Sequence, residues 1–96
     1  MSEVARMEKV LRDSKPYLLE RFRVKEIGIF GSFARDEADG SSDVDILVEF
    51  EEPIGWDVLD LREYLEGILG RKVDVVSRKA LKPALSEGIL REVIFA

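Results

Sequence analysis

The chain has 96 residues with 15 basic and 20 acidic side chains, a formal net charge of −5, and neither cysteine nor histidine. The missing residue types exclude disulfides, thiolate nucleophiles, typical zinc sites and a histidine general base, and the negative charge disfavours direct binding to nucleic acid or anionic lipid. The length predicts one small domain over residues 1–96. The chain lacks an apolar run that could span a bilayer and begins unlike a secretory signal, so we expect a cytoplasmic protein without a membrane partner.

The first elements predicted are a helix and a strand. Apolar residues at three- and four-residue spacings favour an amphipathic helix over residues 3–22. Pro16 predicts either a kink in that helix or two abutting helices, the second capped by Ser14. The segment VKEIGIF, residues 24–30, is short and β-branched and therefore predicts a strand that ends at Gly31.

A short helix and a turn are expected between the first two strands. The helix would run from Ser32 to about Glu37, and the segment ADGSS would form the turn. The next segment, DVDILVEF, alternates strictly between apolar and other side chains and predicts a second strand over residues 43–50. One face of this strand would carry the side chains of Val44, Ile46, Val48 and Phe50, and the other face those of Asp43, Asp45, Leu47 and Glu49.

The remaining elements complete an α/β (α+β) pattern. Residues 55–70 predict a crossover helix that ends at Gly70, and residues 71–77 predict the third strand. A short closing helix is expected within residues 82–95, weakened by Gly88. We therefore predict a small mixed sheet with helices packed mainly on one face.

Two aspartates separated by one valine are typical of a metal site. Asp43 and Asp45 would project from the same face of a strand with Cα atoms about 6.5–7 Å apart, and could reach the same divalent ions. Their hard oxygen ligands favour Mg²⁺ or Mn²⁺ over zinc. Asp74, which interrupts an otherwise apolar strand, offers a third carboxylate. The three acids are our candidate metal ligands and catalytic residues.

Each of these residues also has a structural interpretation. An isolated Asp-x-Asp is more often the solvent-exposed face of a strand, and Asp74 could stand at a strand edge. Gly31 and Ser32 could form a simple strand-to-helix turn, or could bring backbone N–H groups and a hydroxyl to a phosphate. Arg35 is either an exposed helix residue or faces a triphosphate. A Walker-type phosphate loop is excluded because its motif does not occur.

The combination of these motifs resembles a known family. GSFAR at residues 31–35, SDVDILV at 42–48 and KVDVVS at 72–77 are similar to the minimal nucleotidyltransferases of the DNA polymerase beta-like superfamily, which are paired with HEPN-domain proteins. The resemblance covers nearly the whole chain. It departs at Asp36, where the family commonly has glycine.

The resemblance implies a polymerase beta-like nucleotidyltransferase fold and a division of roles among the site residues. By similarity, Gly31 and Ser32 bind the nucleotide's phosphates, Asp43 and Asp45 hold metal, and Asp74 acts as a ligand or base. The implied reaction is transfer of AMP from ATP, with magnesium, to a tyrosine of a HEPN toxin, so that the chain acts as antitoxin. The family's larger members carry a helical domain that binds the acceptor. Here we expect a partner protein to supply the acceptor.

Two other functions stay open at this point. The chain could be a non-catalytic antitoxin that covers its partner, or a nucleotide-sensing subunit that binds ATP without turnover. The base preference, the number of AMP groups transferred and the oligomeric state, whether homodimer or hetero-oligomer, do not follow from the sequence.

Overall fold

The computed structural model describes residues 2–96, and its strands form a four-stranded sheet in the order β3-β2-β1-β4. The strands are β1 (Val24–Phe30), β2 (Val44–Phe50), β3 (Val73–Ser77) and β4 (Ile94–Phe95). Strand β1 pairs antiparallel with β2 and with β4, whereas β2 and β3 are parallel. The mixed sheet confirms the predicted fold class.

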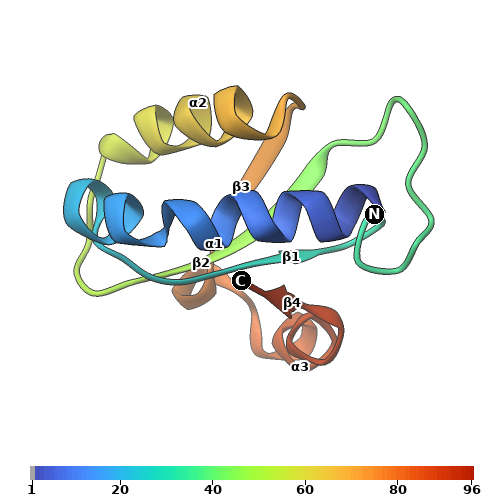
Figure 1. Ribbon diagram of the computed structural model, residues 1–96. Helices are drawn as coiled ribbons and strands as arrows, with labels where there is room; N and C mark the ends of the chain where they lie inside the picture. Colours follow the sequence, from blue (N-terminus) through green and yellow to red (C-terminus); the bar gives the residue numbers. More distant parts are fainter. Residues whose placement is uncertain (1) are drawn as a thin grey trace.

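The helices cover the sheet unequally. They are α1 (Glu3–Phe22), α2 (Asp57–Leu69) and α3 (Pro83–Glu92), with a short 3-10 turn (Arg78–Ala80) before α3. Figure 1 shows α1 and α2 on one side of the sheet and α3 on the other, next to β4. The main core lies between the sheet and the first two helices, and includes Met7, Leu11, Leu18, Ile27, Ile29, Val44, Ile46, Val48, Leu61, Leu65 and Leu69.

Helix α1 is continuous through Pro16, so the predicted alternative of two abutting helices is wrong. A proline inside a helix removes one backbone hydrogen bond, which costs free energy. Buried side chains on both sides of Pro16, Leu11 before it and Leu18 and Phe22 after it, anchor the two halves of α1 in the same core. Tertiary packing therefore overrides the local break signal.

The C-terminal segment contains a strand that the sequence pattern did not predict. Helix α3 ends at Glu92, Val93 is extended with φ −62° and ψ 137°, and β4 then pairs with Gly28 and Ile29 of β1. A strand of two residues is too short to show the period-two alternation from which strands are predicted. The closing helix is therefore shorter than the predicted range.

Helix α2 follows the prediction closely at its end. Gly70 adopts φ +69°, and its N–H donates to the carbonyl of Glu66, as expected of a helix cap in the left-handed conformation.

Within residues 2–96, no helix combines the length and apolarity needed to cross a membrane.

Candidate functional site

The chain leaves β1 through a compact turn, Gly31 to Asp36, rather than through the predicted short helix. The N–H of Arg35 donates to the carbonyl of Gly31 at 3.0 Å, and the N–H of Glu37 donates to the carbonyl of Ser32 at 2.8 Å. Asp36 has φ +58°, in the left-handed region that residues other than glycine, asparagine and aspartate rarely adopt. The backbone therefore explains why glycine would be suited to this position, and why a helix does not continue there.

Gly31 is required by a close approach as well as by its backbone. Its φ is +75°, and a Cβ built on it would lie 2.0 Å from Oδ2 of Asp45. The Asp45 carboxylate thus lies directly against the Gly31 backbone. Only a residue without a side chain leaves room for that contact.

The sheet register brings Asp45 and Asp74 side by side. Asp45 pairs with Asp74 across the parallel strands β2 and β3, and with Phe30 across β2 and β1. Because alternate side chains point to opposite faces, and Ile46 and Val75 face the core, the two carboxylates lie on the opposite face. Neighbouring strands are about 4.8 Å apart, so these like charges are close neighbours.

The three predicted acids form no ion pair in the described part of the chain. Asp43, Asp45 and Asp74 take part in none of the hydrogen bonds or ion pairs among residues 2–96. Burial, followed by the charges of Asp74 and Asp43, raises the pKa of Asp45 above its usual value. Adjacent carboxylates without a basic partner are the arrangement that a bound cation would stabilise.

The structure separates Asp43 from the pair. Across residues 2–96, no three side chains of the His, Cys, Asp and Glu types converge closely enough to hold a metal ion among themselves. Asp45 and Asp74 are in register, whereas Asp43 is exposed and immediately precedes β2. This donor set still fits Mg²⁺, which keeps several waters and is usually bound by one or two carboxylates together with substrate phosphates.

An ordered loop leads into Asp43. The Asp39 carboxylate accepts from the N–H of Ser41 at 2.8 Å and from its hydroxyl at 2.7 Å, and these bonds lower the pKa of Asp39. A surface pocket of about 570 Å³ opens beside this loop, and its lining includes Asp43, Arg71 and Lys72. These two basic residues lie just before β3 and were not among the predicted site residues.

Ser32 is half-buried, and its hydroxyl makes no hydrogen bond within the described residues. The backbone N–H groups of Ser32 and Phe33 likewise donate to no acceptor within residues 2–96. Free N–H groups at the start of such a turn can bind an anion. The turn therefore offers the donors that the phosphate-binding prediction requires.

Arg35 lies at the site but is already paired. Its Nη1 contacts both oxygens of Glu92, at 3.2 and 3.1 Å, and its Nε contacts Glu37 at 3.1 Å. These contacts, Glu92 first, raise the pKa of Arg35, whose charge in turn lowers that of Asp45. Glu92 was not among the predicted site residues, because nothing in the local sequence around it indicates a contact 57 residues away.

A mixed sheet with a glycine–serine turn against an aspartate pair is the arrangement expected of a nucleotidyltransferase. The family model described as nucleotidyltransferase domain matches residues 11–96, and the chain belongs to that family. It is similar to the protein adenylyltransferase MntA of Thermococcus cleftensis, with 47% identity over 99% of this chain and 97% of the relative. A protein adenylyltransferase relative in Methanocaldococcus jannaschii is 41% identical over 99% of both chains.

Solved structures agree with this assignment. A structure described as a minimal nucleotidyltransferase has 45% identity and a TM-score of 0.75, covering 94% of this chain and 88% of that chain. The same fold, at 21% identity and a TM-score of 0.59, occurs in a complex of a tri-AMPylated Shewanella oneidensis HEPN toxin with its MNT antitoxin, covering 97% of this chain and 67% of that chain. The chain is therefore a minimal nucleotidyltransferase of the polymerase beta-like fold.

Proposed function

We propose that this chain transfers AMP from ATP to a tyrosine hydroxyl of a HEPN toxin and so acts as its antitoxin. The observation that carries the proposal is the pairing of Asp45 with Asp74 beside the Gly31–Ser32 turn, where neither carboxylate has an ion-pair partner among the described residues. The high identity to a protein named as a protein adenylyltransferase supports a protein acceptor. The toxin complex that shares the fold makes a HEPN protein the first partner to test.

The nucleotide's phosphates would bind at the turn after β1. The free N–H groups of Ser32 and Phe33 and the Ser32 hydroxyl would donate to phosphate oxygens. Gly31 allows this approach because it has no side chain. Arg35, close enough to lower the pKa of Asp45, would add positive charge near the same oxygens.

Asp45 and Asp43, with Asp74, would hold Mg²⁺ or Mn²⁺. A divalent cation bound there would neutralise the triphosphate and stabilise the charge that develops in nucleotidyl transfer. It would also remove the repulsion between Asp45 and Asp74. Asp74 is exposed and lies in register with Asp45, which supports a role for its carboxylate as the base that takes the proton of an incoming hydroxyl.

The reaction exchanges one phosphorus–oxygen bond for another. The acceptor oxygen forms a bond to the α-phosphorus while the bond from that phosphorus to the bridging oxygen of the β-phosphate breaks. The acceptor proton passes to the Asp74 carboxylate, and pyrophosphate leaves. Orientation of the two reactants can lower the barrier by about 7–11 kcal/mol in well-fitted cases, and docking of the partner protein would provide it here.

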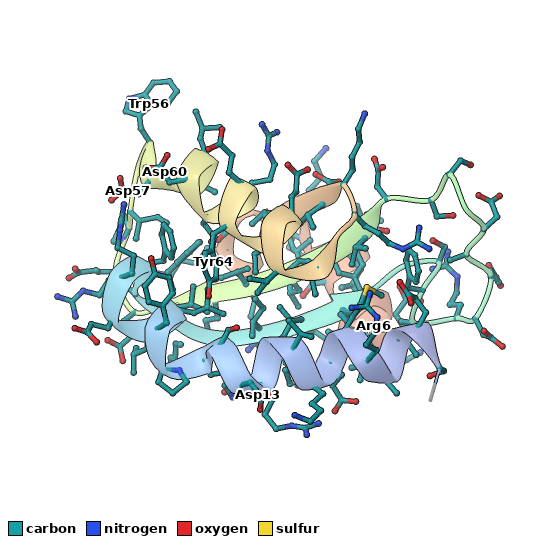
Figure 2. The ribbon with its side chains drawn as sticks, turned by 45° about the horizontal axis from the view of Figure 1, so that its top comes forward. Arg6, Asp13, Trp56, Asp57, Asp60 and Tyr64 are labelled. Atoms are coloured by element: carbon teal, nitrogen blue, oxygen red, sulfur yellow. The ribbon has the colours of Figure 1, made fainter. Side chains whose placement is uncertain are left out.

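The test is incubation with the HEPN partner, ATP and magnesium, followed by intact mass and peptide mapping of the partner. We expect the partner's mass to rise by one or more AMP groups, located on tyrosine. Asp45→Asn should prevent the transfer, whereas Asp60→Asn, on the outer side of α2 near Arg21, should not. Figure 2 shows Asp60 on α2 near Trp56 and Asp57.

A second outcome would replace the enzymatic proposal. If the two proteins bind tightly, ATP is bound and the partner's mass is unchanged, the chain is a binding-only antitoxin. If ATP binds but no stable complex with a HEPN protein forms, nucleotide sensing takes its place.

A further inference from the structure

The carboxylate of Glu92 connects the C-terminal segment to the turn after β1. Its Oε1 accepts the backbone N–H of Gly31 at 3.0 Å, and both its oxygens contact Nη1 of Arg35. The Glu92 side chain is 25% exposed, compared with 46% for Arg35. One partly buried group thus contacts both the first residue of the turn and its arginine.

The sheet explains why Glu92 occupies this place. In the β1–β4 pair, Gly28 faces Phe95 and Ile29 faces Ile94. Continuing this register by two residues brings Gly31 opposite Glu92. Because Glu92 is the last residue of α3, its side chain, rather than an extended backbone, supplies the acceptor that the Gly31 N–H needs.

The side from which Glu92 approaches separates two possible roles. The Gly31 N–H points toward the β4 edge of β1, whereas Asp45 belongs to β2 on the other side of β1. The donors of Ser32 remain without a partner among the described residues. Glu92 therefore contacts the turn from the β4 side of β1 and leaves the donors of Ser32 available to a phosphate.

We propose that Glu92 is a positioning residue of the nucleotide site, which holds the Gly31–Asp36 turn and Arg35 in the conformation that binds phosphate. The inference rests on the proposed function and extends it to the C-terminal segment. Helix α3 and β4 would then form part of the nucleotide site, although they contribute none of its predicted contact residues.

The first measurement is the affinity of the whole chain for magnesium–ATP by calorimetry. Glu92→Ala should weaken binding by about tenfold or more, because it removes a charge-assisted contact and a backbone hydrogen bond. Glu92→Gln should lose less affinity, since the amide oxygen of glutamine can still accept a hydrogen bond from the Gly31 N–H. The matched control is Glu87→Ala, which breaks the ion pair of Glu87 with Arg91 on the same helix and should leave the affinity within about twofold.

Two further readouts distinguish positioning from general loss of structure. In the transfer assay, the KM for ATP should rise in Glu92→Ala while the KM for the protein acceptor stays unchanged. In an Arg35→Ala background, Glu92→Ala should reduce the affinity for magnesium–ATP by a smaller factor than it does in the wild type, because part of its effect acts through Arg35. If Glu92→Ala does not fold, Glu92→Gln serves in the same assays, because it keeps the size and one acceptor of the side chain.

Three results would overturn the inference. Equal affinity for magnesium–ATP in wild type and Glu92→Ala would show that the turn keeps its binding conformation without Glu92. Tighter binding by Glu92→Ala would show that the carboxylate competes with phosphate. Failure of the wild type to bind magnesium–ATP would overturn the proposed function together with this inference, whereas the first two results leave the proposed function standing.

Discussion

Asp45 is partly buried, and burial together with the charges of Asp74 and Asp43 raises its pKa. For an acid whose pKa is higher in the folded than in the unfolded protein, the ionised form destabilises the fold. This penalty is fully present at a pH above the raised pKa. It disappears as the pH falls through the raised pKa toward the ordinary value of 3.8. The metal-free protein should therefore become less stable with rising pH in that window.

Asp45→Asn should accordingly increase the stability of the metal-free protein at neutral pH. The gain should vanish at a pH below both pKa values, where the wild-type carboxyl group is also neutral. Urea unfolding in the presence of a chelator, followed across pH, measures the difference. Asp60→Asn, outside the site, should not show the pH-dependent gain. An Asp45→Asn variant that is less stable than the wild type at neutral pH without metal would contradict the assigned repulsion.

Gly31→Ala should destabilise the fold by about 1–3 kcal/mol, because alanine is strained at φ +75°. The added Cβ would also push the Asp45 carboxylate out of its place, so magnesium–ATP binding should be lost even where the variant remains folded. Chemical denaturation and calorimetry check the two effects. Gly40→Ala is the control, since a Cβ there would meet no atom within 4 Å. Unchanged nucleotide binding by Gly31→Ala would argue against a site at this turn.

At the scale of the elements, α2 and α3 each carry a glycine that packing does not require. A Cβ at Gly67 or Gly88 would meet no atom within 4 Å. Glycine inside a helix loses more conformational freedom on folding than alanine does. These two positions therefore weaken their helices without a compensating contact.

Gly67→Ala and Gly88→Ala should each stabilise the protein by about 0.5–1 kcal/mol, measured by urea unfolding. The effects should add, because the two glycines lie on different helices. Gly28→Ala provides the contrast: the added Cβ would lie 2.6 Å from Cγ2 of Val93 and 3.0 Å from the carbonyl oxygen of Ile94, so this variant should destabilise the pairing of β1 with β4. A loss of stability in Gly67→Ala would show that the helix geometry at that position is misassigned.

The start of α2 shows how weakly composition predicts exposure. The sequence favours Trp56 as an aromatic residue of the core or its rim, and this interpretation is wrong. Trp56, the N-cap of α2, is 86% exposed, and its side chain points away from the fold (Figure 2). Tyr64, within α2, instead packs against Tyr17 with ring centroids 4.8 Å apart. The place of each residue in the fold, before α2 or within it, rather than the residue type, decides which aromatic ring is covered.

At the scale of the whole molecule, the candidate site joins distant parts of the chain. Gly31 follows β1, Asp45 and Asp74 come from β2 and β3, and Glu92 ends α3. A ligand that holds these residues together should therefore stabilise the entire fold rather than one loop. Binding to the native state alone adds about 2.7 kcal/mol at a hundredfold excess over the dissociation constant.

Magnesium–ATP should therefore raise the unfolding temperature of the wild type. The double variant Asp43→Asn, Asp45→Asn should remain folded but lose this shift, because both side chains lie outside the core and have no partners among the described residues. A thermal scan with and without a chelator measures both. The same shift in wild type and double variant would exclude these two aspartates as the metal ligands.

The sequence by itself determined the local features of this protein. Alternation in residues 43–50 assigned Val44 to the core and Asp45 to the other face, and Gly70 marked the end of α2, as the structure confirms. The glycine–serine and aspartate motifs were enough to recognise the family. Such features depend on neighbours within a few residues, so periodicity, capping and short motifs reveal them.

Only the tertiary structure decided how these pieces meet. The register that sets Asp45 beside Asp74, the two-residue strand β4 and the contact of Glu92 with Gly31 all join residues far apart in the chain. The same long-range packing keeps α1 continuous through Pro16. Local sequence could not predict these outcomes, because the energy that selects them comes from burying the shared core and satisfying backbone donors across the sheet.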